Sequence, residues 1–309
     1  MPSFLPYIGI CVIPITLVSS FSSTQSCNIK SHLKLYSVVN DNDLLWNNLI
    51  APEGLSKMEV VMTPEFFISN GGALKKLYSN CIKSTEVKES SIAGAGKGLF
   101  ATKNIKAGSI ISFYPAHALG IDNGIKQIFV SQRPSDEEYF RENPCESSSY
   151  LHATDQPIFN RPSFVEKIQD SGNLKDFPLF LDVNPNRDVD GCWVSQMIND
   201  GASVKTQSEE GILTYYKESK KRKNCIHIPF GPSPVMATIA TRKIKKGEEI
   251  FTSYGCTYWA LDVGITPRIQ LEINDSAKDL LSSMKLASSL YRNELEEIEA
   301  AYNKIENNS

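Results

Sequence analysis

The sequence predicts an α+β fold that is mostly β, because two patterns indicate short strands joined by turns and a third indicates a C-terminal helix. Ala101–Ile111 (ATKNIKAGSII) and Ala240–Ile250 (ATRKIKKGEEI) share Ala, Thr, Ile, Lys, Gly and Ile at matching places, which indicates two similar strand-turn-strand units. A glycine-rich stretch, Gly94–Phe100 (GAGKGLF), directly precedes the first unit. Apolar residues recur every three or four positions over 273–305, which predicts one long amphipathic helix.

The composition is that of a soluble globular protein, with 41% hydrophobic and 22% charged residues among 309. This length allows one core and a second small unit. The net charge of −3 gives no reason to expect direct nucleic-acid binding. The seven Cys form no C-x-x-C or C-x-C pair and the four His are isolated, so we expect no metal site.

Residues 1–26 contain no charged side chain, and Tyr7–Val18 is an apolar run of signal-peptide length that is too short to span a membrane. We expect a targeting segment that is removed, directing the protein to the secretory pathway or an organelle and leaving no transmembrane span. The stretch 20–22 (SFS) resembles the Phe-led junction of two-part plastid presequences. The alternative is a buried or disordered N-terminus on a nuclear or cytoplasmic protein.

Residues 27–85 are interpreted as a flanking segment with three short helices and no catalytic constellation. Asp41–Asp43 is a plausible N-cap for a helix over 44–50, and Thr63-Pro64-Glu65 can start another at Phe66. A third helix is predicted over 73–83.

The glycines of the first unit favour a ligand-binding loop. A dinucleotide-binding motif would need G-x-G-x-x-G at the start of a helix, whereas a strand signal follows Gly98 here. Without side chains, the loop lets its backbone approach a small ligand closely.

The second unit predicts a hairpin of two strands, 235–240 and 249–254, around the turn Lys245-Lys246-Gly247. It ends at Tyr254 followed by Gly255, where backbone and hydroxyl can both face a ligand; the alternative is a core Tyr in a surface hairpin. Between the two units lies Met197–Gly201 (MINDG), which alone could also be a plain turn.

These stretches in this order resemble the SET-domain protein methyltransferases. GAGKGLFAT is similar to the family's opening cofactor-binding motif, MIND to its central Asn-His-Ser motif, and GEEIFTSYG to its closing motif. The resemblance covers 86–259 and implies small sheets around a knot-like core, with a variable insert at about 115–190 lining the substrate groove. Asp200 replaces the usual His. Only Cys256 follows the closing Tyr, so the chain differs from members with a Cys cluster there.

The resemblance implies a transferase that uses S-adenosylmethionine to methylate a lysine of a protein or peptide substrate. It makes Tyr254 the catalytic residue. It assigns the cofactor to Gly94, Gly96, Lys97, Gly98, Leu99, Asn199 and Asp200. Candidate walls of a substrate channel are Phe251, Tyr258, Trp259 and Tyr114, with core packing as the alternative. The second hypothesis is a catalytically silent SET module that binds a peptide or partner protein.

Three further segments lie outside these motifs. In Lys217–Lys223 five of seven residues are basic, which favours a solvated loop; the alternatives are a nuclear-localisation patch or a contact for an acidic partner. The C-terminal segment 260–309 is expected to be one helix, capped by Asn274 or Asp275, that packs on the domain of a monomer. A coiled-coil dimer is its alternative. Within the insert, 163–169 is predicted to be a short helix.

Overall fold

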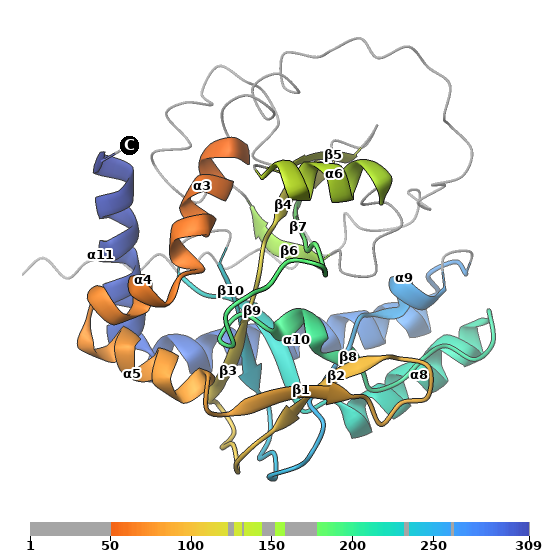
Figure 1. Ribbon diagram of the computed structural model, residues 1–309. Coiled ribbons are helices and arrows are strands. Elements are labelled where there is room, and N and C mark those ends of the chain that lie inside the picture. Colours follow the sequence, from red (N-terminus) through yellow and green to blue (C-terminus); the bar gives the residue numbers. More distant parts are fainter. Residues whose placement is uncertain are drawn as a thin grey trace, which may run out of the picture.

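The computed structural model describes residues 51–122, 127–131, 133–143, 152–157, 178–231, 235–260 and 263–308. The predicted targeting segment and the helices predicted over 44–50 and 163–169 lie outside these ranges. The α+β class is confirmed, with strands at the centre and helices around them (Figure 1).

Three small sheets form the centre of the molecule. The largest has the order β3-β10-β9, all antiparallel. An antiparallel pair, β1-β2, and a parallel pair, β8-β11, complete the set. Their bounds are β1 Thr85–Glu89, β2 Lys97–Ala101, β3 Ile110–Tyr114, β8 Asn199–Asp200, β9 Cys225–Pro229, β10 Met236–Ala240 and β11 Phe251–Thr252.

The two similar sequence units pair with each other about an approximate two-fold axis. Ile105 and Ile244, which occupy matching places, exchange both backbone hydrogen bonds, at 2.9 and 3.0 Å. The amide of Gly108 donates to the carbonyl of Ala240, and the matching amide of Gly247 donates to that of Ala101. Both glycines have φ near +80°, a conformation that other residues rarely adopt. The internal repeat therefore marks two halves that complete one core.

The expected hairpin between 235–240 and 249–254 is wrong. β10 pairs with β3 and β9, whereas only Phe251 and Thr252 form the second strand, and they pair in parallel with Asn199 and Asp200. The reason is that the turn at Gly247 carries the chain to the other repeat, where Ile250 N donates to Leu99 O. This change of partner brings the MIND and closing motifs side by side.

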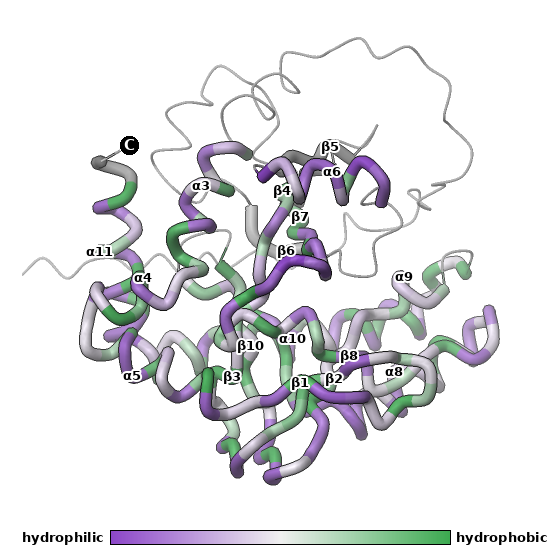
Figure 2. Tube along the Cα trace, in the orientation of Figure 1, coloured by the Kyte–Doolittle hydropathy of each residue, from purple (hydrophilic) through white to green (hydrophobic). Residues whose placement is uncertain are grey.

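Part of the insert forms a separate antiparallel sheet, with the order β5-β4-β7-β6. Its strands are β4 Ala118–Asp122, β5 Gln127–Ser131, β6 His152–Pro157 and β7 Pro178–Asp182. Helix α6 (Pro134–Glu142) follows β5 and is strongly hydrophilic in Figure 2, whereas hydrophobic residues gather around β3 and β10.

Three helices of the flanking segment pack against the main core, as the sequence predicts for two of them. Thr63 caps α4 (Pro64–Ser69) by accepting a hydrogen bond from Phe66 N, and α5 covers Gly72–Cys81. Helix α3 (Ala51–Val61) precedes them. Phe67 of α4 contacts the rings of Phe113 and Trp193, so this segment shares its core with the central sheet.

The C-terminal segment contains two helices, α10 (Pro267–Leu290) and α11 (Arg292–Asn308), so the expectation of one long helix is wrong. Thr266 caps α10 through Ile269 N, eight residues before the predicted Asn274. The chain leaves helical geometry at Tyr291, whose hydroxyl accepts from Ile110 N at 2.8 Å. Tertiary contact at Tyr291 thus interrupts a periodicity that continues in the sequence.

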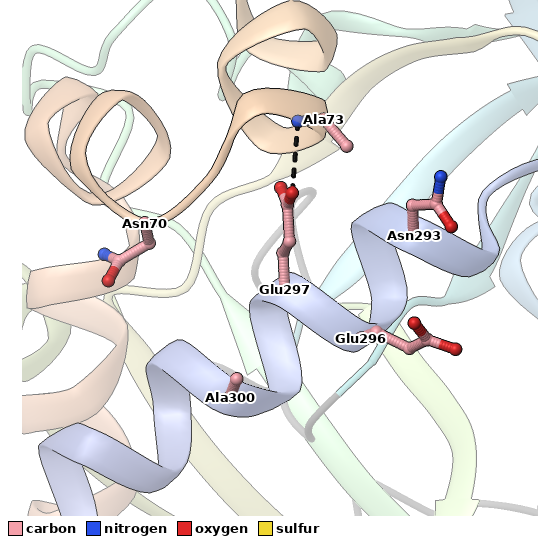
Figure 3. A pocket seen from close by; sticks show the side chains of 6 residues that line it. All are labelled: Asn70, Ala73, Asn293, Glu296, Glu297 and Ala300. Carbon is pink, nitrogen blue, oxygen red and sulfur yellow. Dashed lines mark hydrogen bonds between the residues drawn. The ribbon is translucent and has the colours of Figure 1, made fainter.

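Helix α11 docks on the flanking segment. The Glu297 carboxylate points at the start of α5 and accepts hydrogen bonds from Ala73 N at 3.3 Å and Leu74 N at 2.8 Å (Figure 3). Buried Ile298 and Tyr302 join the main core. The C-terminal segment therefore packs against the rest of the same chain.

The basic run belongs to a helix, α8 (Glu209–Arg222), so the expected loop is wrong. Ser208 caps this helix, Glu209 and Glu210 lie in its first turn, and basic residues lie in its last turn. Lys220 and Lys223 pair with acidic residues of α10, among them Asp279 at 2.7 Å from Lys223. In the described part of the chain no helix is long and apolar enough to cross a membrane.

Candidate functional site

The MIND motif connects the glycine loop to the closing motif. Residues Asn199 and Asp200 form β8 and pair in parallel with Phe251 and Thr252 of β11. The Asn199 side-chain amide donates to Lys97 O, at the end of the glycine loop, over 3.0 Å. The carbonyl oxygen of Ile198, one residue earlier, accepts a hydrogen bond from the Tyr254 hydroxyl. The fold therefore brings together three motifs that lie far apart in the sequence.

The glycine loop joins β1 to β2 and opens to the surface. Gly94 and Gly96 have φ of 79° and 68°, and a Cβ added to either would meet nothing within 4 Å. Ser90 N donates to Gly96 O at 2.8 Å and closes the base of the loop. Lys97 is exposed. Bare backbone in open space is what a closely approaching ligand requires.

Gly98 and Leu99 have structural contacts instead. A Cβ on Gly98 would collide with Oε1 of Glu249. The Leu99 side chain is fully buried in an apolar cluster, and its carbonyl accepts a hydrogen bond from Ile250 N. Of the assigned loop residues, the exposed cradle is thus made by Gly94, Gly96 and Lys97.

Tyr254 lies in a cluster of three aromatic side chains at the end of β11. Its ring centroid is 4.8 Å from that of Tyr258, at a steep angle, and its plane is nearly parallel to that of Trp259. The short helix α9 (Cys256–Trp259) supplies both neighbours. The Tyr254 hydroxyl donates to Ile198 O over 2.9 Å, which fixes the far end of the side chain. Tyr258 is 43% exposed and marks the outer side of the cluster.

The Asp200 carboxylate lies at the centre of the hydrogen bonds around this aromatic cluster. Its Oδ2 accepts from Tyr215 OH at 2.7 Å, Tyr254 N at 2.9 Å and Trp259 Nε1 at 3.0 Å, while Oδ1 accepts from Ala202 N. Burial raises the pKa of Asp200 above its ordinary value, and these hydrogen bonds oppose the rise without cancelling it. The resemblance assigns Asp200 to the cofactor mainly through its backbone, and in the structure the Asp200 side chain contacts the aromatic cluster.

The rings of Phe251 and Tyr114 contact partners other than the Tyr254 cluster. The Phe251 ring is buried, with the Arg222 guanidinium 4.9 Å above it. Tyr114 belongs to the main core, where its ring meets that of His227 at 5.6 Å. The burial of both rings agrees with core packing, the alternative interpretation, whereas Tyr258 and Trp259 contact the ring of Tyr254.

Sequence reasoning missed Glu249 and Tyr215. The Glu249 carboxylate is buried and accepts from Ser90 Oγ at 2.6 Å and Ser91 N at 2.8 Å, which ties the glycine loop to the closing motif. Tyr215 could have been found from the helix signal of α8, where Ser208 precedes two acidic residues and apolar residues recur at helical spacing. Nothing in the local sequence indicated the role of Glu249.

The glycine loop and the aromatic cluster offer different kinds of contact to a ligand. The open glycine backbone and the exposed Lys97 can bind polar groups, and the faces of Tyr254 and Trp259 can pack against a flat or cationic group. Among the described residues, no group of three or more His, Cys, Asp and Glu side chains is placed to hold a metal ion.

A family model described as "SET domain" matches residues 96–255, which is more than half of the chain. Similar solved structures include ATXR5 in complex with mono-methylated histone H3.1, with 15% identity, 62% of this chain and 66% of that chain covered, and a TM-score of 0.35. Another is ctPRC2 in an autoinhibited conformation bound to S-adenosylmethionine, with 16% identity, 63% and 17% covered, and a TM-score of 0.31. No curated protein matches the chain. These structural likenesses are distant, and it is the family model, which covers more than half of the chain and ends at Gly255, that shows that the chain belongs to the SET-domain family.

Proposed function

We propose that this protein transfers a methyl group from S-adenosylmethionine to a lysine side chain of a protein substrate. The observation that carries the proposal is the position of Tyr254. Its hydroxyl lies 2.9 Å from Ile198 O, next to Asn199, whose amide reaches the glycine loop. A candidate catalytic hydroxyl and a candidate cofactor loop are therefore linked through one short strand.

In this proposal S-adenosylmethionine supplies a methyl group on a positively charged sulfur. Gly94, Gly96 and Lys97 bind it through the open loop, and Asn199 contributes its side chain. The loop's backbone can approach closely because a Cβ would have occupied the open space at both glycines. Glu249 supports the site indirectly, since it holds Ser90 and Ser91 at the base of the loop.

Tyr254 would orient the substrate amine. Because its hydroxyl proton is donated to Ile198 O, the oxygen lone pairs can accept an N–H of the incoming amine. Lysine must arrive neutral although its ordinary pKa is about 10.4. The positive charge on the cofactor's sulfur would disfavour a second positive charge on the amine beside it, and so favour the neutral amine. The rings of Tyr258 and Trp259 would line the path of the lysine side chain. Alignment of the amine with the methyl group is a large part of the rate of such a displacement.

Methyl transfer to Tyr254 variants tests the catalytic assignment. A lysine peptide array with labelled S-adenosylmethionine first identifies a substrate peptide. Tyr254→Phe should then lower turnover on the order of 100-fold, because it deletes one positioned hydroxyl and keeps the ring. Tyr291→Phe deletes a hydroxyl bonded to Ile110 N, far from the cluster in sequence, and should keep wild-type turnover. Near-normal turnover of Tyr254→Phe would refute the assignment.

Calorimetric titration tests the cofactor loop separately. Gly96→Val and Asn199→Ala should each weaken binding of S-adenosylmethionine at least about tenfold, since one covers the open backbone and the other removes a polar group. Gly247→Val is the matched control, because Gly247 has a similar positive φ of 82° and open space around its missing Cβ. Wild-type affinity in both site variants would contradict the assignment. Cofactor binding by a wild type that methylates no peptide would favour a silent binding module.

A further inference from the structure

Helix α8 (Glu209–Arg222) follows the MIND motif in the chain. It separates the MIND motif from Asn224, which donates to Glu249 O and accepts from Phe251 N next to β11. Its buried side chains Ile212, Tyr215 and Tyr216 form an apolar cluster with residues of α9 and α10. Packing therefore places one face of α8 directly against the segment that carries Tyr254.

Tyr215 reaches that segment with its hydroxyl. Tyr215 OH lies 2.7 Å from Asp200 Oδ2, 2.9 Å from Ser253 Oγ and 2.9 Å from Gly255 N. A phenol has one proton to donate and two lone pairs. Because the carboxylate can only accept and the amide can only donate, the Ser253 hydroxyl donates to Tyr215. All three hydrogen-bonding capacities of this buried hydroxyl are therefore in use.

Asp200 completes the contacts around Tyr254. Its Oδ2 accepts from Tyr254 N in addition to Tyr215 OH, so three consecutive residues, 253, 254 and 255, are each held by a polar atom. The same Oδ2 accepts from the indole of Trp259, which stacks on Tyr254. An amide in place of the carboxylate would offer one acceptor oxygen and introduce a competing donor. The carboxylate is thus matched to this set of donors.

We propose that Asp200 and Tyr215 are positioning residues that set the backbone and ring orientation of Tyr254 for methyl transfer, with Tyr215 supplied by helix α8. This inference rests on the proposed function, since Tyr254 is its catalytic residue. Ile198 O fixes the hydroxyl end of Tyr254, and the Asp200–Tyr215 pair fixes the backbone end. Small displacements of a reacting group cost large factors in rate, so a pair that holds both neighbours of Tyr254 affects turnover more than binding.

Steady-state kinetics of Tyr215→Phe and Asp200→Asn test the pair with the array peptide. We expect turnover to fall on the order of 10-fold for Tyr215→Phe and 100-fold for Asp200→Asn, with the peptide KM and the affinity for S-adenosylmethionine within about twofold of wild type. Tyr291→Phe is again the control, because it too removes a hydroxyl bonded to a backbone amide. Tyr215→Phe keeps the test valid if Asp200→Asn does not fold.

A spectroscopic signal separates positioning from activity. The sequence has three Trp, and the indole N–H signal of Trp259 can be assigned in a ¹H–¹⁵N spectrum with a Trp259→Phe variant. Asp200→Asn should shift this signal, because it changes the acceptor of the indole, whereas Tyr291→Phe should leave it unchanged.

Three outcomes decide the inference. Turnover of both variants within twofold of Tyr291→Phe would overturn it, as would a loss of turnover that only accompanies an equal loss of cofactor affinity and folding. A wild type that methylates no array peptide would refute the proposed function instead. The Trp259 signal would then decide alone, and an unchanged signal in Asp200→Asn would overturn the positioning role.

Discussion

Two carboxylates, the buried Asp200 and the partly buried Glu59, obtain their hydrogen-bond partners in different ways. Asp200 is 5% exposed and is surrounded by neutral donors: a phenol, an indole and two backbone amides. Glu59 of α3 instead forms a bidentate pair with Arg187, at 2.6 and 2.7 Å, and a further pair with Arg133. Arg187 also binds Asp136 at 2.9 Å, which joins α3, α6 and the segment after β7.

The difference appears in the pKa values of the two carboxylates. Burial raises the pKa of both, but at Glu59 the hydrogen bonds and charges of Arg187 and Arg133 outweigh burial and lower the pKa below its ordinary value. At Asp200 the donors are neutral, and the pKa is raised. Charged side chains hold together elements that are separate in the chain, as Arg187 does. Several neutral donors, as around Asp200, instead fix the orientation of one short segment through directional hydrogen bonds.

The largest effect is expected from removing the shared cation of the ion-pair group. Arg187→Met should lower the free energy of unfolding by about 3–5 kcal/mol, because it leaves the buried Asp136 and the partly buried Glu59 without their common partner. Denaturant unfolding measures the change. Arg133→Met is the matched control, since Arg133 is 53% exposed and its pair should contribute no more than about 1 kcal/mol. Equal losses in the two variants would contradict a central role of Arg187.

A smaller loss of stability is expected at Asp200. Asp200→Asn should lower the free energy of unfolding by about 1–3 kcal/mol, since neutral donors lose part of their acceptor and no charge is left unpaired. The same denaturant titration gives the value. A loss larger than that of Arg187→Met would show that neutral donors stabilise this chain more than the ion pairs do.

The pH dependence of the two contributions should have opposite signs. The lowered pKa of Glu59 means that its stabilisation is present above the unfolded value, about 4.3, and is lost as the pH falls through the folded value. The raised pKa of Asp200 means that the pH-dependent part of its contribution is largest below about 3.9 and decreases as the pH rises through the folded value. Unfolding free energies of wild type relative to Glu59→Gln and to Asp200→Asn, measured across pH, should therefore change in opposite directions. Changes in the same direction would contradict the comparison.

The smallest effect is expected at the surface pair between α8 and α10. Lys223→Met should cost at most about 1 kcal/mol, because its partner Asp279 is 52% exposed and the attraction is screened. Unfolding at low and high salt measures this, and the difference from wild type should shrink with salt. A loss as large as that of Arg187→Met would mean that the docking of α8 depends on charge rather than on its buried apolar face.

The sequence by itself determined the family and most motif positions. Its internal repeat, glycine loop, MIND stretch and closing Tyr254 are local patterns, and each depends on turn chemistry or strand propensity that adjacent residues specify. The N-cap of α4 at Thr63 and the strand after Gly98 follow from the same short-range rules. These features depend on interactions between residues that are close together in the sequence, so they could be predicted.

Only the tertiary structure decided which partners those motifs meet. The pairing of Ile105 with Ile244, the parallel contact of β8 with β11 and the break at Tyr291 depend on residues far apart in the chain. The same is true of Glu249, whose carboxylate lies under the glycine loop, and of Asp200 and Tyr215 around Tyr254. A buried polar group needs hydrogen-bond partners, and the fold can supply them from residues far away in the sequence.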